Sequence, residues 1–220
     1  MATKVANTEG EKQSHSGTYF LTLVKKHQRK AVGGGVGVAI IAAGIWFTMA
    51  TNERRAMFAD RALQSARASV SVGNLPLAAN DLSRVVSTYG GTPAGDEAAI
   101  LLAHVRLLRN EAALAAAELR AFIQTGPQRH LVMSANALLG TALEQVGQMV
   151  QAARAYEAAT DAARFPFMQA EYLADAARTY RAGGDFQSAR LVYERIIEEF
   201  SETPSFREAR MRLSELGGSE

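Results

Sequence analysis

Four stretches of this 220-residue chain share one design: GNLPLAANDLSRVV (73–86), NEAALAAAELRAFI (110–123), GQMVQAARAYEAAT (147–160) and GDFQSARLVYERII (184–197). Each begins 37 residues after the previous one, at Gly73, Asn110, Gly147 and Gly184. A constant period of this length is typical of solenoids, in which one supersecondary unit is copied and stacked. The chain is therefore expected to be a repeat protein.

Aligning the units from residues 59, 96, 133 and 170 shows which positions hold small side chains. Position 20 is always alanine, and position 8 is alanine or glycine: Ala78, Ala115, Ala152, Ala189; Ala66, Ala103, Gly140, Ala177. Position 15 is the glycine or asparagine that opens each stretch, and these residues accept a left-handed turn. Positions 24 and 27 are mostly larger: Leu82, Leu119, Tyr156, Tyr193; Val85, Phe122, Ala159, Ile196. The pattern predicts two antiparallel helices that cross closely at positions 8 and 20.

The predicted fold class is all-α, because Ala, Leu, Glu and Arg dominate and β-branched runs are absent. A repeat domain is expected over residues 51–220, with units near 59–95, 96–132, 133–169 and 170–206 and a closing helix at 207–216. Prolines are expected between units, where a helix must stop: Pro93, Pro127, Pro166 and Pro204. Asn74 is expected to cap the second helix of unit one, with Pro76 in its first turn.

Residues 31–50, AVGGGVGVAIIAAGIWFTMA, contain no charge and are long enough for one transmembrane helix of roughly 30 Å. A cleaved signal peptide is the alternative, but its apolar region is normally shorter and Thr48-Met49-Ala50 is a poor cleavage site. Gly35-Val36-Gly37 does not continue into a nucleotide-binding loop. Gly33, Gly37 and Gly44 share one helical face, which predicts close packing against another helix.

Basic residues are concentrated in front of the predicted span. Residues 1–30 hold five Lys and one Arg against two Glu, whereas residues 51–220 hold 18 Arg against 20 acidic residues. The cluster KKHQRK (25–30) favours a cytoplasmic N-terminus and a repeat domain on the other side of the membrane. We expect a disordered tail at 1–17 and a basic amphipathic segment at 18–30. A slightly acidic repeat domain argues against nucleic acid as a partner.

The small–Gly–small–aromatic scheme resembles the tetratricopeptide repeat (TPR), most clearly in unit four: Ala177, Tyr180, Gly184, Asp185, Phe186, Ala189, Tyr193. The usual period is 34, so these are long variants. The overall layout, including Tyr19–Phe47, is similar to the ancillary subunit family of the SecYEG translocon. That resemblance implies an inner-membrane anchor and a periplasmic repeat domain that binds chaperones and the translocon. The last unit is also similar to repeat proteins of outer-membrane assembly, but those are lipoproteins and this chain has no cysteine.

No pattern predicts catalysis, a cofactor or a metal. The chain has no cysteine and no His-Glu-x-x-His spacing, and His104 and His130 are 26 residues apart. Pairs such as Asp96-Glu97 suit a helix N-terminus or a solvated face. An enzyme is therefore not expected, and no small-molecule substrate is predicted.

Protein binding is the expected function. In a TPR hairpin, set positions of the first helix line a groove, and the resemblance places ten residues there: Leu63, Arg67, Ile100, His104, Leu107, Thr141, Glu144, Glu171, Arg178 and Arg181. Ordinary solvated surface is the alternative for each of them. Two functional hypotheses stay open: a membrane-anchored module that recruits other proteins, and a permanent structural subunit of a larger membrane complex.

Overall fold

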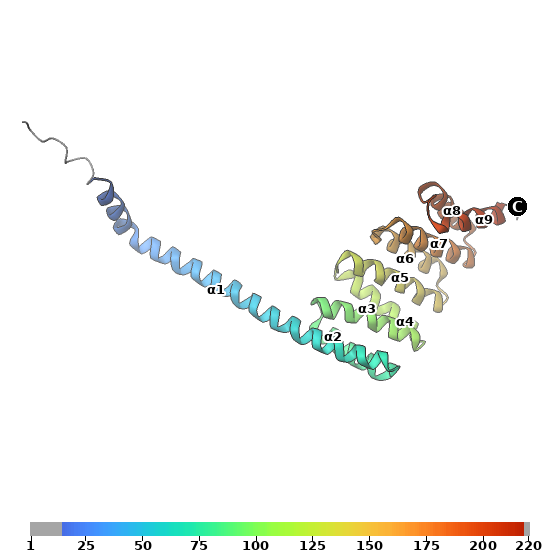
Figure 1. Ribbon diagram of the computed structural model, residues 1–220, viewed down its shortest axis with the longest axis horizontal. Helices are drawn as coiled ribbons and strands as arrows, with labels where there is room; N and C mark the ends of the chain where they lie inside the picture. Colours follow the sequence, from blue (N-terminus) through green and yellow to red (C-terminus); the bar gives the residue numbers. More distant parts are fainter. Residues whose placement is uncertain (1–14, 218–220) are drawn as a thin grey trace, which may run out of the picture. The chain divides into compact units, whose positions relative to one another are not determined.

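The computed structural model describes the backbone of residues 15–217 and the side chains of residues 41–217. These residues form helices and no strand (Figure 1): α1 (His15–Ser71), α2 (Leu75–Tyr89), α3 (Pro93–Leu108), α4 (Ala112–Gln124), α5 (Arg129–Gln145), α6 (Met149–Ala162), α7 (Pro166–Ala182), α8 (Phe186–Glu199) and α9 (Pro204–Gly217). The chain divides into two compact units, Met1–Arg54 and Arg55–Glu220. The described part of the second unit confirms the all-α prediction and holds the helical hairpins.

Each hairpin turns at the residue that the repeat pattern predicted. The backbone φ angles of Gly73, Asn110, Gly147 and Gly184 are 74°, 60°, 79° and 80°. This left-handed conformation reverses the chain within a few residues, and glycine adopts it without a Cβ clash. Asn110 is the only described non-glycine residue with positive φ.

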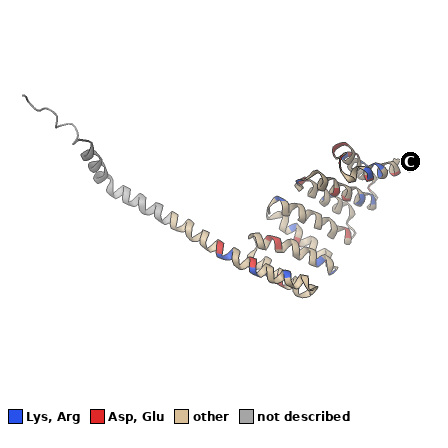
Figure 2. Ribbon diagram, viewed as in Figure 1, with Lys and Arg blue, Asp and Glu red and all other residues tan. Residues whose placement is uncertain are grey.

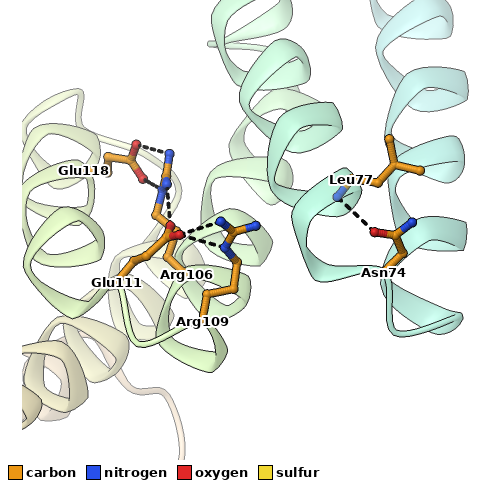
Figure 3. Close-up of polar contacts among 6 residues, drawn as sticks. All are labelled: Asn74, Leu77, Arg106, Arg109, Glu111 and Glu118. Atoms are coloured by element: carbon orange, nitrogen blue, oxygen red, sulfur yellow. Dashed lines mark hydrogen bonds and ion pairs between the residues drawn. The ribbon is translucent and has the colours of Figure 1, made fainter.

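The hairpin of α3 and α4, which lacks the turn glycine, is held by a cluster of ion pairs (Figure 3). The Arg106 guanidinium donates two hydrogen bonds to Glu118, at 2.5 and 2.9 Å, and one to Glu111 at 3.0 Å. Arg109 also pairs with Glu111, at 2.7 Å. The fork-shaped contact of Arg106 with Glu118 fixes the relative position of the two helices as well as adding energy.

Helix starts explain why the predicted unit boundaries need correction. Pro93, Pro166 and Pro204 are the first residues of α3, α7 and α9, so they begin helices rather than separate units. A proline fits the first turn because no hydrogen bond is expected from its nitrogen there. The boundaries at 96, 133 and 170 consequently fall inside α3, α5 and α7, and the closing helix starts before 207.

The predicted cap at Asn74 is present. Its Oδ1 accepts a hydrogen bond of 3.2 Å from the backbone N–H of Leu77 (Figure 3). Thr92 and Asp185 cap α3 and α8 in the same way. These caps satisfy donors that the helix itself leaves unpaired.

The core is continuous along the described hairpins. All alanines at positions 8 and 20 are buried: Ala66, Ala78, Ala103, Ala115, Ala152, Ala177 and Ala189. One apolar cluster runs from Ala59 to Val105, the next from Ala103 to Ala155, and the third from Ala153 to Ala209. Each cluster therefore joins neighbouring hairpins, as expected of a solenoid in which every unit is stabilised by the next.

Gly140 occupies position 8 of unit three because Tyr156 fills the space beside it. A Cβ added at Gly140 would lie 2.7 Å from two carbon atoms of the Tyr156 ring. Tyr156 belongs to position 24, so the small residue makes room for the aromatic ring as well as for the helix crossing. Units one and two combine alanine at position 8 with leucine at position 24, Leu82 and Leu119. Unit four combines Ala177 with Tyr193, so the glycine matches the close position of the Tyr156 ring and is not required by every aromatic residue at position 24.

The predicted span 31–50 lies within α1. Its second half, residues 41–49, is exposed, and Figure 2 shows no charged residue in this part of α1. Among the residues that the structure describes, no helix is long and apolar enough to cross a membrane. The side chains of residues 31–40, and with them Gly33 and Gly37, lie outside the described residues, as does the predicted tail up to residue 14. A Cβ atom added at Gly44 would meet no other atom within 4 Å, apart from the backbone of its own helix.

The contact between Gly140 and Tyr156 gives a double-mutant test. Gly140→Ala should lower the free energy of unfolding by roughly 1–3 kcal/mol, because the added methyl overpacks the site. In a Tyr156→Leu background the same change should be neutral or stabilising by up to about 1 kcal/mol, since alanine favours helix over glycine. Urea denaturation of the four proteins measures this coupling. Equal effects in both backgrounds would show that the ring and the glycine are not in contact.

Candidate functional site

The first helices of the hairpins carry the predicted groove residues. We give the name first-helix face to the exposed and half-buried residues of this set on α1, α3, α5 and α7, together with exposed Leu108, which lies one turn after His104 on α3: Arg67, Ile100, His104, Leu108, Thr141, Glu144, Glu171, Arg178 and Arg181. Leu63 and Leu107 do not belong to it. They are only 3% and 7% exposed and pack in the core, so their assignment to a groove is wrong.

Ion pairs connect successive first helices on this face. Arg67 of α1 contacts Glu97 of α3 at 2.5 Å. Glu144 of α5 contacts Arg178 of α7 at 2.8 Å, and Arg181 of α7 contacts Glu215 of α9 at 3.2 Å. Three of the predicted residues therefore pair with the next unit, which fixes their side chains in place.

The densest polar network surrounds Glu144. Its carboxylate accepts two hydrogen bonds from Arg178, at 2.8 and 2.9 Å, and one of 2.6 Å from the Tyr156 hydroxyl. Thr141 lies 3.2 Å from the same hydroxyl. Tyr156 comes from α6, so its ring passes beside Gly140 and presents its hydroxyl to the first-helix face. The structure thus brings Thr141, Glu144 and Arg178 together.

The environment changes the pKa values of this network in opposite directions. Burial raises the pKa of Glu144, but the hydrogen bonds from Arg178 and Tyr156 outweigh it and hold the net pKa below the usual 4.5. Burial chiefly raises the pKa of Asp175, although Arg178 lies 3.4 Å away and opposes the shift. Arg178 therefore stabilises mainly the Glu144 carboxylate, and the Asp175 carboxylate is less well paired.

The middle of the first-helix face differs from its two ends. No ion pair joins α3 to α5 in the part of the chain that the structure describes. His104 is exposed there, Ile100 is half-buried, and Leu108 is 54% exposed. An apolar side chain and an imidazole that form no ion pair across these helices are easier to desolvate than the paired ends. This middle section is therefore the part of the face without ion pairs between successive first helices in the described residues.

Two features of the surface give no signal in the repeat alignment, the role of the Tyr156 hydroxyl and the clefts between helices. The repeat alignment predicts packing for Tyr156 at position 24, yet its hydroxyl also completes the Glu144 network. Clefts form between helices where the alignment gives no signal. One of about 710 Å³ lies among α2, α3 and α4, and its lining includes Val86, Leu102, Leu119 and Phe122 as well as Asp96 and Glu118. Such clefts depend on side-chain packing between units.

The described residues offer no grouping that would support metal chemistry. No cluster of three or more His, Cys, Asp or Glu side chains within residues 41–217 is placed to hold a metal ion. His104 lies on α3 and His130 on α5. The absence of a cofactor and of a catalytic centre stays a prediction from the sequence.

The lowered pKa of Glu144 predicts how this network depends on pH. A carboxylate whose pKa is lower in the folded protein adds stability that is complete above the unfolded value, near 4.5, and is lost as pH falls through the folded value. The difference in free energy of unfolding between wild type and Glu144→Gln should therefore be constant near neutral pH and shrink below about pH 4.5. Arg178→Gln should remove the same component, and the double variant little more. A difference that does not change between pH 7 and pH 3 contradicts this assignment.

Comparisons with known proteins agree with this architecture. A family described as "Tetratricopeptide repeat-like domain" matches residues 25–218. Similar solved structures include MamA, residues 41 to the end, from Desulfovibrio magneticus RS-1, with 19% identity, a TM-score of 0.51, and coverage of 64% of this chain and 74% of that one. A tetratricopeptide repeat protein from Parabacteroides merdae has 13% identity, a TM-score of 0.58 and coverage of 73% and 60%.

A putative kinesin light chain with TPR-like repeats from Podospora anserina is also similar, with 18% identity, a TM-score of 0.56 and coverage of 71% and 84%. At such identities these likenesses concern the fold alone. No curated protein sequence matches the chain. Because the family match spans most of the chain and the hairpins have the expected geometry, the protein belongs to the tetratricopeptide repeat-like domain family.

Proposed function

We propose that the protein is a membrane-anchored module that binds other proteins through its first-helix face. The family fold supports a protein-interaction scaffold, since TPR-like hairpins present side chains of successive helices on one surface. The single observation that carries the proposal is the middle of this face, where exposed Leu108 and His104 lie between two sections of paired charges.

The anchor is proposed from residues 31–50. They carry no charge, and the described half exposes Ile41, Ile45, Trp46, Phe47 and Met49. A Trp-Phe pair near the end of an apolar stretch is typical of a membrane interface. The basic cluster at 25–30 favours a cytoplasmic N-terminus and a periplasmic repeat domain at a bacterial inner membrane. The partner would then be a membrane-bound or periplasmic protein, of the translocon or chaperone type suggested by the overall layout.

Tethering explains how a modest binding surface would suffice. A domain fixed to the bilayer meets a membrane-bound partner at a high effective concentration, so weak contacts give appreciable occupancy. The charged ends of the face would set the orientation of the partner, because electrostatic complementarity contributes more to specificity than to affinity.

A permanent structural subunit is the second candidate. It is favoured by the glycines at 33, 37 and 44, which would let another membrane helix approach closely; the described one, Gly44, has open space beside it. In that case contacts within the membrane would hold the complex, and no exchangeable partner would occupy the first-helix face.

A photo-crosslinking amino acid at position 108 of the full chain, activated in intact cells, tests the proposal. We expect adducts with membrane or periplasmic proteins that are absent when the same group replaces exposed Gln187 on α8. Adducts only with cytoplasmic proteins would reverse the proposed orientation. One stoichiometric, salt-stable adduct would favour the structural subunit, and equal labelling from both positions would contradict a binding function for the first-helix face.

A further inference from the structure

A second cleft lies at the edge where hairpins connect. It has a volume of about 790 Å³ and is bounded by the start of α5, the end of α6 and the start of α7. Its apolar lining comes from Met133, Ala162, Ala163, Phe165 and Met168. Methionine side chains adapt their shape to different partners, so such a lining suits the binding of varied apolar groups.

The polar lining of this cleft is basic. Arg129, His130 and Arg164 contribute to it, together with the amides of Gln128 and Gln169, and no acidic side chain does. The cleft among α2, α3 and α4 is different, because Asp96 and Glu118 line it. The charged lining of this cleft is therefore positive, in a domain whose residues from 51 onward have more acidic than basic groups.

The two guanidinium groups are not neutralised by carboxylates. Arg129 donates to the backbone carbonyls of Asp161 and Ala162, at 2.8 and 3.1 Å. Arg164 lies over the Phe165 ring, 5.7 Å from its centroid. Within residues 41–217, neither arginine forms an ion pair with an acidic side chain. Neutral partners thus hold the two guanidinium groups in place, and their positive charge stays available to pair with an anionic ligand. The N-termini of α5 and α7, which lack side-chain caps, add to the positive potential.

An exposed aromatic pair borders the same cleft. Phe165 and Phe167 stack with their ring centroids 5.8 Å apart, although their side chains are 49% and 56% exposed. Two large apolar rings held together on the surface next to an apolar cleft form a continuous patch, which in a soluble domain indicates contact with a partner. Aromatic and arginine side chains are also the residues that most often dominate binding energy.

We propose that this cleft, which we call the edge cleft (Arg129, His130, Met133, Arg164, Phe165, Met168), binds an acidic peptide segment of a partner protein. An apolar side chain of the segment would occupy the space between Met133 and Met168 and pack on the aromatic pair. Its carboxylates would pair with Arg129 and Arg164. Charge complementarity selects this occupant, because a basic or neutral apolar segment would cover both guanidinium groups without supplying a negative charge to balance them.

The edge cleft goes beyond the proposed function and does not rest on it. The crosslinking site at position 108 lies on α3, whereas the edge cleft is built from α5, α6 and α7. If crosslinking at position 108 failed, binding to the edge cleft could still be measured, and the reverse also holds.

The test uses the full chain, purified in detergent, and a phage-displayed library of random dodecapeptides. Selected peptides should be enriched in Asp or Glu beside Phe, Leu or Trp. By fluorescence anisotropy, a selected peptide should bind the Arg164→Glu/Phe165→Ala variant at least about tenfold more weakly than wild type, as for loss of a central anchor. Arg210→Glu/Phe186→Ala is the matched control, since it also removes a guanidinium stacked on a ring and a 56% exposed phenylalanine. This control variant should bind the selected peptide as tightly as wild type does.

A charge exchange separates binding from a folding defect. The single variant Arg164→Glu should lose the acidic peptide and gain affinity for the same peptide with lysine in place of its acidic residues. Selected peptides without acidic enrichment, or equal binding by wild type and the double variant, would overturn the proposal. So would self-association of the wild type that Arg164→Glu abolishes in sedimentation experiments, because a second copy of the chain would then be the occupant.

Discussion

The close crossing of two helices through small side chains is the constraint on which the rest of the structure depends. At positions 8 and 20 the backbones approach so closely that only alanine or glycine fits, and all of these alanines are buried. Dispersion contacts between the backbones are then numerous, and each hairpin becomes a rigid pair of helices. The left-handed turns at Gly73, Asn110, Gly147 and Gly184 allow this pairing because they reverse the chain without a spacer.

A hairpin joined through small residues cannot bury its larger ones by itself. Leu82, Leu119, Tyr156 and Tyr193 therefore pack toward the next unit, and the three apolar clusters each extend over neighbouring hairpins. The same stacking places first helices side by side, so arginines and carboxylates of adjacent units form the pairs at Arg67, Glu144 and Arg181. The arrangement of charges on the first-helix face thus follows from the stacking of the core. Where the pairs are missing, between α3 and α5, we propose that the face binds a partner.

Much of the solenoid could be predicted from the sequence because small residues recur at the same positions of every unit. The turns, the buried alanines and the cap at Asn74 follow from backbone sterics, which are local. Unit boundaries were placed too late, since a proline equally ends one helix or begins the next, and only capping geometry decides. The family positions place Leu63 and Leu107 in the groove, but both are core residues, because a family position does not specify how far each helix is rotated. The Glu144 network and the edge cleft depend on side chains from three helices, and no pattern along one helix contains that information.

The most direct measurement concerns the helix crossing itself. Ala115 at position 20 is fully buried, whereas Ala117 on the same helix α4 is exposed. Ala115→Leu should lower the free energy of unfolding by roughly 1–3 kcal/mol, because the larger side chain forces the two helices apart. Ala117→Leu should change it by less than about 0.5 kcal/mol. Equal urea midpoints for the two variants would contradict the close crossing and with it the stacked-hairpin account.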